Sequence, residues 1–207
     1  MKTMRSIILY AIVLTMISGC TSQTQSIQDK SIAEKEVSTK KNPDVNEYKG
    51  IPLKIGVLGS APEIRETNIE FQELSLEDLS IKKVEEYDGI FIMKEFLESA
   101  ADGPYSNTFK KSDIPFFFIE TKAYYFPFIE DKISYKDYTK RVTDSVIYAF
   151  GYYPNSGNVK TWQLNITAQD PSEKEKKEII KEIYSQIFVI TEEVKNTVHV
   201  SDETSEK

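Results

Sequence analysis

The chain has 207 residues and a formal net charge of −7, with one cysteine and one histidine. This acidity argues against a nucleic-acid partner, since the phosphate backbone attracts basic surfaces. The cysteine count excludes an internal disulfide and a cysteine-based metal or redox site, and the single His199, close to the C-terminus, argues against a Ser-His-Asp triad or a histidine-rich metal site.

The first twenty residues combine a basic start with a short apolar run. Lys2 and Arg5 precede the mainly apolar residues 7–17. This run is too short to cross a bilayer, which takes about 20 residues, but it has the length of the apolar part of a secretory signal. The run ends at Ile17, and Ser18, Gly19 and Cys20 follow it.

This arrangement resembles the signal of bacterial lipoproteins, in which an aliphatic and two small residues precede a cysteine. The resemblance implies a signal peptide at residues 1–19, cleaved after Gly19. It also implies a diacylglyceryl group on the Cys20 sulfur and a fatty acid such as palmitate on the new amino terminus. Two or more acyl chains suffice for stable anchoring. We therefore expect a lipid-anchored protein on the outer face of the cell membrane.

Residues 20–49 are rich in Ser, Thr, Gln, Lys and Glu, with few large apolar side chains. Such a composition cannot bury enough apolar surface to fold, so we expect a flexible, lipidated tether. The folded domain is predicted to span residues 51–194. Residues 195–207 are polar and acidic, and we expect a disordered tail there.

Four apolar segments in the first part of this domain have the character of buried strands. They are Leu53–Ser60, the weaker Phe71–Leu76, Tyr87–Glu95 and Ile114–Thr121. Segments that can form helices separate them, and Ser75 with Asp78 resembles a capping box. Near-continuous apolar strands alternating with helices favour a parallel sheet that is covered on both faces.

The remaining part favours a β-hairpin and then a helix. Ser145–Tyr153 and Val159–Thr167 flank a loop of turn-forming residues, and the second strand would place Trp162, Leu164 and Ile166 on one face. A helix over residues 136–150, started by Ser134, is the alternative. A long helix follows, with Asp170 as the expected N-cap, Pro171 at its first position and Glu173 completing a capping box.

The predicted fold is therefore a single α/β domain with a mainly parallel sheet of the flavodoxin or Rossmann type. An antiparallel β-hairpin and a C-terminal helix complete it. The segments "KIGVLG", "YDGIFIMKE" and "IPFFFIET" resemble those of small Gram-positive lipoproteins. That resemblance implies no particular activity.

Ligands of open α/β sheets bind beyond the carboxyl ends of the strands. That edge is expected to display Gly59 and Ser60, then Glu95, then Glu120, with the aromatic Tyr124 and Tyr125 overhanging it. Gly56 and Gly59 match neither a dinucleotide fingerprint nor a phosphate-binding loop, so we expect no cofactor. Glu95 and Glu120 could act as acid and base or hold a cation, but solvated strand ends are the simpler interpretation, and we expect no metal site.

These observations favour a non-enzymatic binding or interaction module of the cell envelope, with an envelope protein or a small ligand as its partner. A small solute-binding lipoprotein that serves a transporter is the second hypothesis. An envelope enzyme that uses Glu95 and Glu120 is the third.

Overall fold

The computed structural model describes residues 47–142, 147–155 and 158–205. The predicted signal peptide, Cys20 and all but the last residues of the predicted tether lie outside this part of the chain. Within it, the strands are β1 (Leu53–Leu58), β2 (Ile69–Leu74), β3 (Gly89–Ile92), β4 (Phe116–Ile119), β5 (Ile147–Tyr153) and β6 (Lys160–Asn165). The helices are α1 (Ile81–Val84), α2 (Leu97–Asp102), α3 (Ser106–Lys111), α4 (Phe126–Ile129), α5 (Tyr135–Thr139) and α6 (Glu173–Ser205), with short 3₁₀ helices at η1 (Leu76–Asp78) and η2 (Lys94–Phe96).

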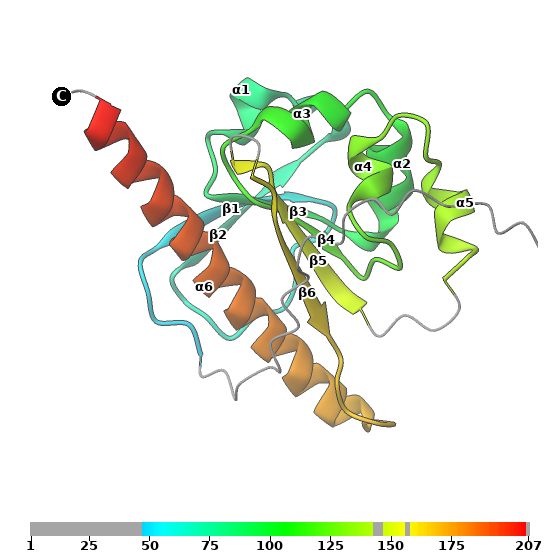
Figure 1. The fold of residues 1–207 in the computed structure, drawn as a ribbon. Coiled ribbons are helices and arrows are strands. Elements are labelled where there is room, and N and C mark those ends of the chain that lie inside the picture. Colours follow the sequence, from blue (N-terminus) through cyan, green and yellow to red (C-terminus); the bar gives the residue numbers. More distant parts are fainter. Residues whose placement is uncertain (1–46, 143–146, 156–157, 206–207) are drawn as a thin grey trace, which may run out of the picture. The chain divides into compact units, whose positions relative to one another are not determined.

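The strands form one mixed sheet in the order β2-β1-β3-β4-β5-β6 (Figure 1). β1 pairs in parallel with both β2 and β3, and β3 pairs in parallel with β4. β4, β5 and β6 then pair antiparallel. The parallel part has the strand order of doubly wound sheets, in which the chain moves outward from a central strand in both directions. The predicted α/β fold, with its mainly parallel sheet, hairpin and C-terminal helix, is confirmed.

The predicted hairpin forms in preference to the alternative helix. β5 and β6 pair from Ile147 with Asn165 to Tyr153 with Lys160, with an extra residue in β5 at Tyr148. The Ser134 start that suggested the helix is used only by α5, which ends at Thr139. Trp162 packs against Phe117, and Leu164 lies in the same apolar cluster, as the alternation in β6 predicted.

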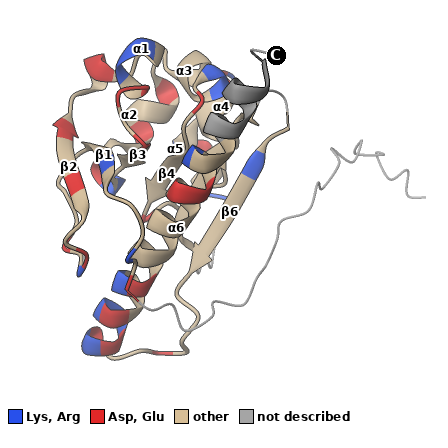
Figure 2. Cartoon of the chain, turned by 90° about the vertical axis from the view of Figure 1, so that its left-hand side faces the viewer, with Lys and Arg blue, Asp and Glu red and all other residues tan. Residues whose placement is uncertain are grey.

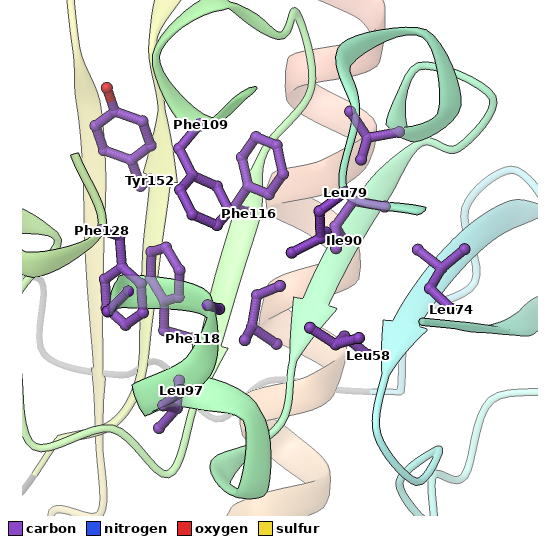
Figure 3. Packing of buried hydrophobic residues seen from close by; sticks show 14 of the residues in the cluster. Leu58, Leu74, Leu79, Ile90, Leu97, Phe109, Phe116, Phe118, Phe128 and Tyr152 are labelled. Carbon is purple, nitrogen blue, oxygen red and sulfur yellow. The ribbon is translucent and has the colours of Figure 1, made fainter. Parts of the chain in front are cut away.

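Two apolar layers sandwich the sheet. Side chains on one face pack under α1–α5, where Phe118 stacks on Phe128 with ring centroids 3.6 Å apart (Figure 3). On the other face, Phe91 stacks between Tyr184 and Phe188 of α6. Alternate residues of β3 and β4 therefore serve opposite layers, which is why these strands are apolar at every position.

The domain boundaries differ from the predicted ones at both ends. Tyr48 is 4% exposed and packs against Phe188, so the ordered domain begins before Ile51. α6 continues without a break past Val194 to Ser205, so the residues expected to form a disordered tail are helical to that point.

The N-terminus of α6 also differs from the prediction, because the cap is Ser172 and not Asp170. The Ser172 hydroxyl accepts from the Glu175 N–H at 3.3 Å, and the Glu175 carboxylate accepts from the Ser172 N–H at 2.9 Å. This is a capping box two residues later than expected.

None of the described helices is long and apolar enough to span a bilayer.

Candidate functional site

A cleft of about 340 Å³ opens at the carboxyl ends of the parallel strands, on the face of the sheet that α6 covers. β1 leads toward β2 on one side and has β3 as its neighbour on the other, so the crevice lies where the crossover direction reverses. Such a switch point is where ligands bind in open α/β sheets. The volume lies at the lower end of the range of small-molecule sites, roughly 300–1,000 Å³.

The loop between β1 and β2 forms one wall of the cleft through Ser60, Ala61, Pro62 and Glu63. Gly59 begins this loop with φ +117°, a conformation that only glycine adopts readily. A Cβ at Gly59 would also lie 2.6 Å from Oε1 of Glu95. That carboxylate accepts a hydrogen bond from the Ser60 N–H at 3.2 Å, and so Glu95 positions the loop and does not line the cleft.

The floor of the cleft carries two tyrosine hydroxyls. Tyr148 of β5 and Tyr184 of α6 are buried, with 3.2 Å between their hydroxyl oxygens. Burial raises the pKa of both groups, and the Tyr148–Tyr184 hydrogen bond opposes this effect at Tyr148. Both hydroxyls therefore stay protonated at neutral pH. One of the two hydroxyl hydrogens forms the hydrogen bond between the tyrosines, and the other can be donated to an acceptor on a bound ligand.

Glu120 closes the cleft beside Tyr148 at the end of β4. Its φ is +53°, an unusual value for a residue with a side chain, and its N–H donates to the Tyr148 carbonyl at 2.6 Å. Its carboxylate pairs with Lys94 at 3.2 Å, but both side chains are largely exposed. Water therefore screens this pair, so either group can change partner at little cost.

The opposite wall is the second and third turns of α6, which contribute Lys177, Ile180 and Lys181. Lys181 pairs with Glu178 at 3.1 Å. Within the described part of the chain, Lys177 has no carboxylate partner. Figure 2 shows acidic and basic residues interleaved along these first turns of α6. The cleft therefore offers ammonium groups, carboxylates and a hydroxyl to a ligand, around an apolar floor.

A buried glutamate ties the loop wall to the helix wall. The side chain of Glu66 is fully buried and accepts hydrogen bonds from the Tyr48 N–H at 3.2 Å and from the Ser185 hydroxyl. Arg65 donates through Nε and Nη2 to the same hydroxyl, at 3.1 and 2.9 Å. Ser185 lies one helical turn from Lys181, so this clamp joins the β1–β2 loop to the helix that forms the opposite wall of the cleft.

The structure brings only some of the predicted site residues together. Ser60 and Glu120 line the cleft, and Gly59 and Glu95 shape its loop. Glu95 and Glu120 bind separate partners, and the hydrogen bonds and ion pairs of the described residues do not join them. Tyr124 and Tyr125 lie on the other face, where their rings pack on Phe150. Among the described residues, no three His, Cys, Asp or Glu side chains gather as a metal site would require.

The contribution of α6 to the cleft was not predicted from the sequence. Ile179, Ile180, Ile183 and Ile187 mark the apolar face of this helix, and the hydroxyl of Tyr184 beside them is the one sequence signal of a polar group there. Comparison of the chain with protein-family models, curated proteins and solved structures finds no match in any of the three.

Proposed function

We propose that this protein is a lipid-anchored binding module of the cell envelope, tethered through Cys20 to the outer face of the membrane. The module binds its ligand in the cleft beneath Ser60 and Glu120. The single observation that supports the binding role most strongly is the position of this cleft. It lies at the switch point of the sheet, and a loop, three strand ends and a helix contribute to it.

The anchoring half of the proposal rests on the segment around Cys20, which has the charge, the apolar run and the small residues of a lipoprotein signal. Metabolic labelling with an alkyne fatty acid tests it. The unmodified chain should acquire the label and fractionate with membranes. A Cys20→Ser chain should do neither, and persistent labelling of that variant would refute the anchor.

The binding half of the proposal is non-enzymatic. Glu95 positions a loop and Glu120 pairs with an exposed lysine, which does not favour an acid–base pair. The ligand is a protein or a wall component. An open cleft of this kind takes up one side chain or end group of such a larger partner.

A solute receptor serving a transporter is the second candidate, and the volume of the cleft favours it. Such a receptor gains stability from its ligand by RT ln(1 + [L]/Kd). A thermal-unfolding screen against amino acids, sugars and small anions separates the two candidates. A receptor should show a rise in melting temperature that increases with the logarithm of ligand concentration. A module for macromolecules should show none.

A further inference from the structure

β6 forms one edge of the sheet. Among the strands that the structure describes, it pairs only with β5. Among the described residues, no backbone hydrogen bond joins residues 160–167 to any other segment. An edge strand presents a row of free N–H and C=O groups, which is a template for another strand.

The two edges of the sheet differ in the features that prevent such pairing. β2, at the other edge, carries the exposed Glu70 and Glu73. The nine residues Thr161–Gln169 contain no charge and no proline, in a chain of which 29% is charged. Figure 2 shows acidic residues on β2, whereas β6 carries a single basic segment, which is Lys160 at its start. The bulge at Tyr148 lies in β5, so β6 itself is regular. Natural edges are usually blocked by charge, proline or a bulge. In β6 the only such feature is the exposed Lys160 at its first position, and the strand from Thr161 onward has none.

The pattern of β6 is complementary to itself. Trp162, Leu164 and Ile166 face the α6 layer, while Gln163 and Asn165 face the other side, where Gln163 donates to Asn165 at 3.0 Å. A two-fold axis through Leu164 would place Trp162 opposite Ile166 and Gln163 opposite Asn165. These two cross-strand pairs match apolar with apolar and amide with amide, the kind of pair that stabilises sheets.

We propose that β6 pairs antiparallel with β6 of a second copy of this chain, about a two-fold axis at Leu164, so that the two sheets join edge to edge. The proposal goes beyond the ligand cleft and does not depend on it. One short strand from each copy buries less area than a standard interface of about 1,600 Å². The contact is therefore weak in dilute solution, and it forms where the chains are concentrated.

Disulfide trapping in cells that express the full chain tests both the pairing and its register. Two variants are made, Gln163→Cys and Asn165→Cys, and expressed singly or together under a mild oxidant. Residues directly opposite have Cβ atoms about 4.5–5.5 Å apart, whereas diagonal neighbours are about 7–8 Å apart, too far for a disulfide. The mixture should therefore give a covalent dimer, and each variant alone should give only background.

Three controls make the result decisive. The unmodified chain shows how much covalent dimer Cys20 alone produces. A Gln72→Cys chain shows how much dimer arises from chance collision at the β2 edge. A mixture of Thr161→Cys with Gln163→Cys, which are not opposite each other in the proposed pairing, tests the register. A dimer in the test mixture alone supports the proposal. No dimer, equal dimer in the controls, or a crosslink to a different protein would overturn it.

A thiol-free measurement covers the case in which a cysteine disturbs the fold. Sedimentation of the lipidated protein in mild detergent, at high protein concentration, should show dimers. Introducing Gln163→Glu with Asn165→Glu sets like charges opposite each other and should abolish them. A Thr67→Glu change, on the exposed loop before β2, should leave them intact. Dimers that survive the β6 charges would refute the pairing.

Discussion

Replacing Glu66 by alanine tests whether the buried clamp holds the β1–β2 loop against α6. Glu66 accepts hydrogen bonds from the backbone of Tyr48 and Arg65, at 3.2 and 3.3 Å, and from the Ser185 hydroxyl. Its side chain is fully buried, and that of Arg65 is 27% exposed. Alanine would leave the buried Tyr48 N–H without its acceptor and the Arg65 guanidinium without the Glu66 carboxylate, whereas the Ser185 hydroxyl keeps the Lys181 carbonyl as an acceptor at 3.1 Å.

The expected cost follows from these contacts. Breaking a buried ion pair by removing one partner costs about 3–5 kcal/mol. The guanidinium of Arg65 can still reach water, so we expect the lower end, about 3 kcal/mol of unfolding free energy. Glu66→Gln keeps an acceptor but loses the charge, and its cost should lie between those of alanine and the unmodified chain.

Urea unfolding, followed by the fluorescence of the single Trp162, measures this effect, since the indole packs against Phe117 in the core. With a slope of about 2 kcal/mol per molar urea, Glu66→Ala should lower the midpoint by about 1.5 M. Glu63→Ala, an exposed change on the same loop, should alter unfolding by less than about 0.5 kcal/mol. If both variants unfold alike, the clamp does not hold the loop.

Three further perturbations test other parts of the structure. Gly59→Ala should cost about 1–3 kcal/mol in urea unfolding, because φ is +117° and the new Cβ would meet Glu95; a neutral result would contradict this backbone. Phe118→Ala should cost about 3–5 kcal/mol, since the ring is fully buried and stacked on Phe128; an unchanged midpoint would contradict this packing. Burial raises the pKa of Tyr152 to about 12. The unfolded chain loses this proton near pH 10, as a free tyrosine does at about 10. The folded state therefore binds more protons between pH 10 and 12, and stability should fall as pH rises through that window. Tyr152→Phe should make the fall less steep, and an unchanged slope would count against the assignment.

Much of the sheet could be predicted because burial on both faces leaves a simple pattern. β3 and β4 are apolar at every position and therefore stand out in the sequence. The loop between β5 and β6 is dense in turn formers, which made a hairpin the better interpretation. The end of β4 was less clear, because nothing in the sequence shows that Glu120 adopts a positive φ and stops the strand at Ile119.

The start of α6 shows why some boundaries escape local reasoning. Asp170 with Glu173 and Ser172 with Glu175 are both capping-box patterns, and they compete within six residues. The hydrogen bonds of Ser172 decide in favour of the second. Asp170 instead has φ +49°, which turns the chain after β6 toward the helix.

The cleft could be predicted only in part, because its walls come from distant segments. The expected parallel direction of the strands placed Ser60 and Glu120 at one edge, but helix periodicity alone cannot tell which strand ends α6 crosses. Lys177 and Tyr184 were therefore missed. Glu66 was missed for a different reason: a single glutamate in a polar loop has no pattern, and only the fold shows that it is buried.

Native mass spectrometry of the full-length protein, extracted gently from its own membranes, tests the central claim most directly. We predict a chain that begins at Cys20, carries a lipid and retains an additional bound mass. Ser60→Trp, which fills the cleft, should remove the bound mass, while Val189→Trp, on the exposed side of α6, should retain it. A chain without lipid, or a bound mass that both variants keep, would contradict a lipid-anchored module that binds its ligand in this cleft.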